Sequence, residues 1–177
     1  MLFRSLSVIL LAALALANPL VGRSEVTALQ KAFTGLTNTF SAVRDACSVF
    51  ATNVDNAHAE DIFSLMGTLD SLLINASKVV PDVLDGEWIC DGYRSSLSLD
   101  HQVADAFMAR KDDFQTVGLV NDTCLIFQET MADTSLLEGK LLNATPDSWK
   151  ACVQRYQGIS RNISSAVLKA YSCGSQE

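Results

Sequence analysis

The chain has 177 residues and a net charge of −7, with 13 Lys and Arg against 20 Asp and Glu, and 49% of its residues are hydrophobic. This apolar fraction is enough for a buried core at this length, so intrinsic disorder is excluded for the chain as a whole. The acidic balance and the lack of clustered Lys and Arg exclude a general nucleic-acid binder and disfavour binding to an anionic membrane surface.

The first residues have the pattern of a secretory signal. Arg4 is followed by an apolar run from Leu6 to Leu14 and by Ala15-Leu16-Ala17, a small-x-small cleavage site. The run is shorter than a membrane span requires, and no second run predicts a transmembrane segment. We therefore expect a signal peptide over residues 1–17 and one secreted domain over residues 18–177, extracellular or associated with a cell wall and without a glycolipid anchor.

Four N-x-[ST] sequons without a central Pro support export. They are Asn75, Asn121, Asn143 and Asn162. If these sites carry glycans, each must face solvent, and Asn143, in a predicted loop, is the strongest candidate.

The next elements are predicted from periodicity. From Val26 to Val54 apolar residues recur in alternating steps of three and four, which predicts a long amphipathic helix. The same spacing from Ile62 to Val79 predicts a second helix, after a turn at residues 55–56 and before the stop at Pro81. Residues 81–97 lack a clean period, which favours a crossover loop with at most a short helix.

Three further helices are predicted downstream. One covers residues 99–116 and closes at Gly118, and the next covers residues 119–142. The last covers residues 146–173, with an apolar stripe through Trp149, Cys152, Tyr156, Ile163, Val167 and Ala170. Thr145 precedes Pro146, which suggests a capping hydroxyl before a proline at the first helical position. The fold class predicted is all-α, an up-and-down bundle of four long helices plus a shorter or broken one.

The five cysteines of a secreted chain allow up to two disulfides and one free thiol. With antiparallel helices at 1.5 Å per residue, Cys90 and Cys152 lie at one end of the bundle. Cys47, Cys124 and Cys173 lie at the other. We therefore expect a disulfide between Cys90 and Cys152 and a second one among the remaining three.

Known catalytic motifs are missing. The nucleophile elbow, the zinc-binding His-Glu-x-x-His helix, the phosphate-binding loop and the dinucleotide-binding turn do not occur. His58 and His101 are predicted on the surface, and the acidic pairs at residues 60–61 and 112–113 at solvated helix positions. We expect no enzymatic activity, catalytic residue, metal or cofactor, although an enzyme with an unknown motif remains an open alternative.

The apolar interior is therefore the candidate site, either as a closed core or as a space that holds a chain-like ligand. The predicted lining residues are Phe33, Leu36, Phe40, Phe50, Ile62, Leu65, Leu69, Leu73, Phe107, Phe127, Met131, Tyr156 and Ile163. Arg110 and Lys111, next to Phe107 and Phe114, could meet the carboxylate of a lipid, or could simply be solvated helix charges.

The segments Lys111-Asp112-Asp113-Phe114 and Gly118-Leu119, with Thr130, Leu136-Leu137, Pro146 and Ala166 to Ser172, resemble the fungal hydrophobic surface binding protein A family. This family is also called the cell wall galactomannoprotein (mannoprotein 1) family. The resemblance implies a helical protein that adsorbs to hydrophobic surfaces or encloses fatty-acid-like lipids. The five cysteines and the absence of a Ser/Thr-rich tail depart from familiar members and put wall anchoring in doubt.

Two function classes remain. The first is a secreted, non-enzymatic protein that binds a fatty acid or another apolar ligand or surface. The alternative is a secreted helical interaction protein or enzyme inhibitor that docks on a protein partner outside the cell, with an exposed apolar patch and no internal cavity.

Overall fold

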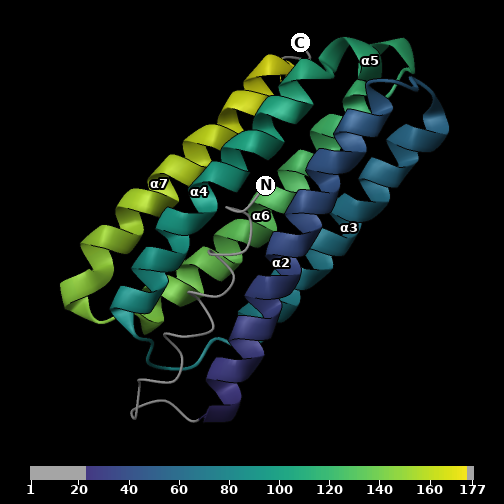
Figure 1. Ribbon diagram of the computed structural model, residues 1–177. Helices are drawn as coiled ribbons and strands as arrows, with labels where there is room; N and C mark the ends of the chain where they lie inside the picture. The colour runs from purple at the N-terminus through teal and green to yellow at the C-terminus, as the bar shows by residue number, and fades with distance from the viewer. Residues whose placement is uncertain (1–22, 175–177) are drawn as a thin grey trace, which may run out of the picture.

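The computed structural model describes residues 23–174, with side chains from residue 27 onward. This range contains α2 (Arg23–Phe50), α3 (Asn56–Lys78), α4 (Gly86–Ala109), α5 (Lys111–Thr116), α6 (Val120–Ala144) and α7 (Asp147–Ala170), and no strand. The long helices lie side by side in an elongated bundle (Figure 1). The predicted all-α class is confirmed, with five long helices where four were expected. The predicted signal peptide lies outside the described residues.

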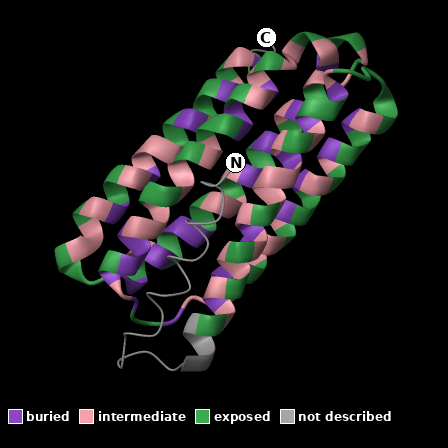
Figure 2. Ribbon diagram, viewed as in Figure 1, coloured by how far each residue is buried: buried purple, intermediate pink, exposed green. Residues whose placement is uncertain are grey.

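The five long helices form a closed ring. Packing contacts run from α2 to α3, from α3 to α6, from α6 to α7, from α7 to α4, and from α4 back to α2. Buried residues follow the sides of the helices that meet their neighbours, and exposed residues cover the outside (Figure 2). Chain order and ring order differ, because α3 and α4 are consecutive in sequence but are not neighbours in this ring.

Consecutive helices alternate in direction, so α2, α4 and α7 run one way and α3 and α6 the other (Figure 1). We call the end that holds α5 and the turn after Phe50 the α5 end. The opposite end, which holds residues 79–85 and the turn between α6 and α7, is the crossover end. Leu84 fixes the crossover there, since its backbone N–H donates to the carbonyl oxygen of Ala144 at 2.8 Å.

The segment predicted as a crossover loop is mostly helix. The loop prediction over residues 81–97 is wrong because α4 already begins at Gly86. Asp85 caps α4, and its carboxylate accepts hydrogen bonds from the backbone N–H groups of Glu87 and Trp88 at 3.0 and 3.1 Å. The crossover is therefore only seven residues long, from 79 to 85.

The helix predicted over residues 99–116 is interrupted. The backbone leaves α4 at Arg110, whose N–H bonds to the carbonyl oxygen of Phe107 at 2.9 Å, and α5 then begins in a new direction. Gly118 ends this unit with φ +77°, a left-handed conformation that glycine adopts without strain. The predicted close at Gly118 is confirmed.

Thr145 does not cap α7. Its hydroxyl donates instead to the carbonyl oxygen of Leu141 at 2.7 Å, and no side chain caps the helix at Pro146. The predicted capping hydroxyl is therefore wrong. The hydroxyl is satisfied within the end of α6, in a position that is 3% exposed.

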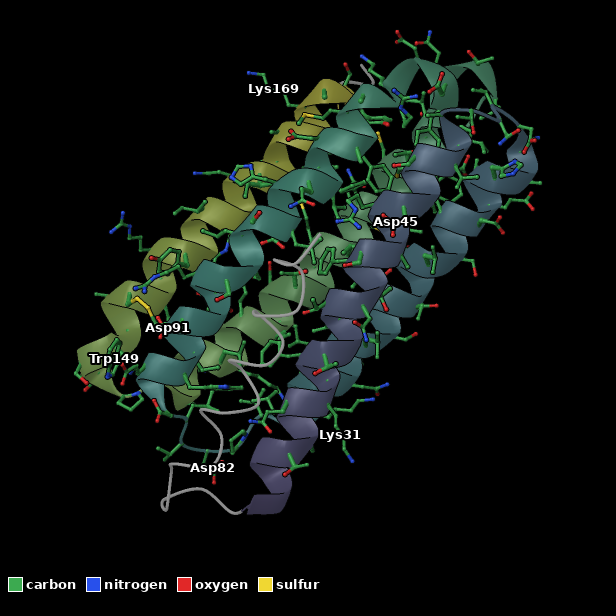
Figure 3. The ribbon with its side chains drawn as sticks, in the orientation of Figure 1. Lys31, Asp45, Asp82, Asp91, Trp149 and Lys169 are labelled. Atoms are coloured by element: carbon green, nitrogen blue, oxygen red, sulfur yellow. A yellow bond between two sulfur atoms is a disulfide. The ribbon has the colours of Figure 1, made fainter. Side chains whose placement is uncertain are left out.

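Two disulfides connect the helices at opposite ends of the bundle. Cys90 on α4 is bonded to Cys152 on α7, with Cα atoms 6.0 Å apart, as the predicted arrangement of the helices requires. Cys124 on α6 is bonded to Cys173 just after α7, with Cα atoms 5.4 Å apart. Cys47 is the free thiol of the predicted group of three, and it is buried. Figure 3 shows a disulfide at the crossover end beside Asp91 and Trp149.

Candidate functional site

The predicted lining residues divide by burial. Eight are buried: Leu36, Phe50, Ile62, Leu69, Leu73, Phe107, Phe127 and Ile163. Three others are half-buried and pack against this core: Phe33, Phe40 and Leu65. The predicted apolar interior therefore exists, with contributions from all five long helices.

The α5 end of the interior is closed by aromatic rings. Phe114 of α5 lies at their centre, with ring centroids 4.8 Å from Phe50, 5.8 Å from Phe63 and 5.9 Å from Phe107. Tyr171 completes this aromatic cluster, and its hydroxyl donates to the carbonyl oxygen of Phe107 at 2.7 Å. Phe50, Phe107 and Phe114 are fully buried, so they pack against one another here.

Arg110 and Lys111 also lie at the α5 end, at the junction of α4 and α5. The guanidinium of Arg110 pairs with the carboxylate of Asp113 at 3.0 Å. Burial raises the pKa of the nearby Cys47 thiol to about 12, and the positive charge of Arg110 opposes this shift. The candidate head-group residue Arg110 is thus already paired, beside an end that aromatic side chains fill.

Two residues predicted to line the interior lie outside the core. Tyr156 is on the outer side of α7, where its hydroxyl accepts from Arg94 Nε at 3.1 Å and the guanidinia of Arg94 and Arg155 approach its ring. Met131 is half-buried and does not belong to the core cluster. The face of α7 that turns inward is therefore not the one through Tyr156.

The middle of the ring holds a polar network that sequence reasoning missed. Gln157, 1% exposed, donates from its side-chain amide to Tyr93 Oη at 3.1 Å and to the carbonyl oxygen of Glu138 at 3.0 Å. The Glu138 carboxylate, whose side chain is 3% exposed, accepts from Arg161 Nε at 2.8 Å. The network joins α4, α6 and α7 across the interior.

Asp100 extends this network along α4. Its carboxylate accepts a hydrogen bond from Ser160 Oγ of α7 at 3.2 Å. Burial raises the pKa of Asp100 to about 6, although the hydrogen bond from Ser160 and the charge of His101 lower it. Burial likewise raises the pKa of Glu138, and the hydrogen bond and charge of Arg161 oppose that shift. The mid-section is therefore a polar band within an apolar ring.

Two buried side-chain atoms have no hydrogen-bond partner in the described part of the chain. They are Oε1 of Glu138, an acceptor, and Nε1 of Trp88, a donor. Buried polar atoms are nearly always paired, so we expect a water molecule or a polar group of a ligand at each of these. Trp88 also contacts Phe33 of α2 edge to face, with ring centroids 5.8 Å apart.

A shallow groove lies on the outside of the bundle between α2 and α3. Its volume is about 400 Å³, and Ala46, Val49, His58, Asp61, Ser64 and Leu65 line it. Leu65, predicted to face the interior, is therefore part of this outer surface. The large exposed apolar residues do not form one patch, because Val49 and Val54 lie at the α5 end and Val83 at the crossover end.

All four sequon asparagines are exposed: Asn75, Asn121, Asn143 and Asn162. Asn143 lies in the last turn of α6, not in the loop where it was predicted. Their exposure meets the steric requirement for glycans.

Other kinds of site find no support in residues 23–174. No group of three or more His, Cys, Asp or Glu side chains there is arranged to hold a metal ion. None of the helices in this range combines the length and the apolar character that crossing a membrane requires. His58 is tied to the turn before α3, with Nδ1 2.7 Å from the Asp55 carboxylate.

The ring of helices matches a solved structure. This is the crystal structure of Afmp4p, a mannoprotein of Aspergillus fumigatus, in complex with palmitic acid. The TM-score is 0.77 with 13% sequence identity, and the match covers 83% of this chain and 99% of that chain. The likeness shows a shared fold. No family model matches the sequence, and no curated protein matches it either.

Proposed function

We propose that this protein is a secreted, non-enzymatic binder of fatty-acid-like lipids, which it holds between the helices of the ring. The observation that carries the proposal is that its closed ring of five helices, with an apolar interior, has the fold of a chain crystallised with palmitic acid. The apolar interior, to which all five long helices contribute, is where we expect a chain-like ligand to bind.

The energetics allow such binding without a strong head-group contact. Burial of about fifteen methylenes is worth roughly 12 kcal/mol, against association costs of roughly 4 to 15 kcal/mol. Micromolar affinity requires about 8 kcal/mol in total. Apolar burial in the ring can supply most of this free energy.

The half-buried side of α4 offers a position at which to test whether a lipid lies between the helices. Tyr93, Ser96 and Asp100 are three to four residues apart and therefore share a face of α4. Ser96 is half-buried, whereas the adjacent Ser95 is exposed. Each hydroxyl donates to a carbonyl oxygen of its own helix, so a substitution breaks no hydrogen bond between helices.

Native mass spectrometry of protein purified from a secreting host tests the proposal. We expect a co-purified lipid, or uptake of one palmitic acid per chain after delipidation. Ser96→Phe should reduce that uptake about tenfold or more, since the phenyl group of the new side chain would occupy space between the helices. Ser95→Phe is the matched control and should bind like the wild type.

Circular dichroism establishes that both variants retain the helical fold. A folded Ser96→Phe with unchanged uptake would place the lipid elsewhere. A wild-type protein that is isolated empty and takes up no palmitic acid would refute lipid binding and favour adsorption to hydrophobic surfaces.

Secretion is the second part of the proposal. It is supported by the signal-like residues 1–17, by the two disulfides, which form in oxidising compartments, and by the exposure of the four sequon asparagines. Sequencing of the secreted chain should place its N-terminus directly after Ala17, and glycosidase treatment should lower its mass. A mature chain that keeps Met1 would contradict this part.

A further inference from the structure

The unpartnered atoms Glu138 Oε1 and Trp88 Nε1 lie in the same half of the ring. Glu138 is six residues before the end of α6, which places it about 9 Å from the crossover end at 1.5 Å per residue. Trp88 is two residues after the start of α4, at that same end. The aromatic cluster fills the opposite end, so polar atoms available to a ligand occur in the crossover half.

The charged and titratable groups around Glu138 come from three other helices, α7, α4 and α3. Arg161 on α7 donates to its Oε2, and Tyr93 and Asp100 on α4 lie close enough for its charge to raise the pKa values of both. On α3, Asp70 accepts a hydrogen bond from Thr130, which lies on α6 two turns before Glu138. The net charge of these groups is therefore negative, and the single positive group among them, the guanidinium of Arg161, belongs to a side chain that is 54% exposed.

A carboxylate head group fits these surroundings poorly. It would add a negative charge beside Glu138 and Asp100 and leave the acceptor Glu138 Oε1 without a donor. An uncharged O–H group both donates and accepts, so it can satisfy either kind of atom.

We propose that the crossover half of the ring binds the polar end of a lipid through an uncharged O–H group that donates to Glu138 Oε1. A long-chain alcohol or a protonated fatty acid supplies this group, and an ionised fatty acid does not. The inference rests on the proposed lipid-binding function and defines its head-group chemistry.

Three probes of similar chain length separate these chemistries: hexadecan-1-ol, palmitic acid and methyl palmitate, which has no donor. Displacement of a neutral fluorescent lipid from the delipidated full chain is measured at pH 5 and pH 8. Hexadecan-1-ol should bind about tenfold more tightly than methyl palmitate at both pH values, the worth of one hydrogen bond to a charged group. Palmitic acid should bind at least about tenfold more tightly at pH 5, where much of it is neutral.

Glu138→Gln tests the residue itself. The amide keeps an acceptor oxygen but removes the charge, so binding of palmitate at pH 8 should rise about tenfold and the dependence on pH should shrink. Glu129→Gln, on the exposed side of the same helix, is the matched control and should change neither.

Equal affinities for the alcohol and the methyl ester would overturn the inference, as would palmitic acid that binds equally at both pH values. Loss of palmitic acid binding at pH 8 on Arg110→Gln would overturn it too, since the head group would then lie at the α5 end. If all three probes bind alike, the proposed function stands and only this inference fails. If none of them binds, both fail.

Discussion

The contact between Gly86 and Trp149 provides a direct test of how the crossover end is packed. Gly86 is the first residue of α4, and a Cβ placed on it would overlap Cβ, Cγ and Cδ1 of Trp149 on α7. These atoms are close to the Trp149 backbone, so rotation of the side chain cannot relieve the overlap. Gly86→Ala therefore forces α4 and α7 apart beside the Cys90–Cys152 disulfide.

The expected cost follows from measured overpacking. Insertion of one methyl group into a packed site costs typically about 1 to 3 kcal/mol. The higher helix propensity of Ala returns less than about 1 kcal/mol. We expect a net loss of about 1 to 2 kcal/mol, which for a domain of this size lowers the melting temperature by roughly 2 to 8 °C.

Gly67→Ala is the matched control. Gly67 is exposed within α3, and a Cβ there would meet no atom within 4 Å. The same substitution should therefore stabilise the protein by about 0.5 to 1 kcal/mol.

Urea unfolding followed by circular dichroism measures both variants with the disulfides intact. Opposite signs of the two changes in the free energy of unfolding support the packing described. A Gly86→Ala variant as stable as Gly67→Ala would show that α7 does not press on the start of α4, and the reasoning would be refuted.

Three other predictions follow from buried groups. Asp100→Asn should stabilise the fold at pH 8 by up to about 3 kcal/mol, and much less at pH 4. The reason is that the pKa of Asp100 in the folded protein, about 6, exceeds its ordinary value of 3.8, so the wild-type protein loses stability as the pH rises through this window. Urea unfolding at the two pH values measures the difference, and equal effects of the substitution would contradict it. Cys47, buried with its pKa raised to about 12, should resist maleimide in the native protein and react as a single thiol in guanidinium, whereas a second reactive thiol would contradict the disulfide assignment. Replacement of Cys124 and Cys173 together by Ala should cost about 4 kcal/mol in urea unfolding, given their separation of 49 residues, and a cost below about 1 kcal/mol would refute this value.

The first two helices could be predicted closely because their periodicity is regular. The predicted apolar spacing ends at Val54, while α2 ends at Phe50 and leaves Val54 39% exposed in the turn. The second predicted helix corresponds to α3, with Asp55 as its cap. Local sequence decides these elements, since caps and apolar repeats act within one or two turns.

Only part of what fixes the start of α4 is local. Gly86 suggested a loop, but glycine is required there by the contact with Trp149, 63 positions further along the chain. The capping role of Asp85 was visible in principle, since an Asp before a helix is a common start signal.

The inward face of α7 was predicted correctly only in its second half. The predicted stripe included Ile163 and Val167, which are buried, but nearer the start of the helix it passed through Cys152 and Tyr156, whereas the structure buries Val153 and Gln157. Val153 and Gln157 begin a repeat of four and three that continues through the half-buried Ser160 and Ser164 to the buried Val167 and Tyr171. It was missed because half of these residues are polar, and a buried polar residue can be recognised only when its partners on other helices are known.

The sequence by itself determined that the chain forms amphipathic helices and at which end of the bundle each cysteine lies, because helical rise and apolar repeats are properties of one segment. Only the tertiary structure decided that α3 and α6 lie side by side, that α4 lies between α2 and α7, and that the buried Glu138 carboxylate pairs with Arg161 of α7. These arrangements depend on how side chains from separate helices fit together, and that fit is a property of the assembled ring.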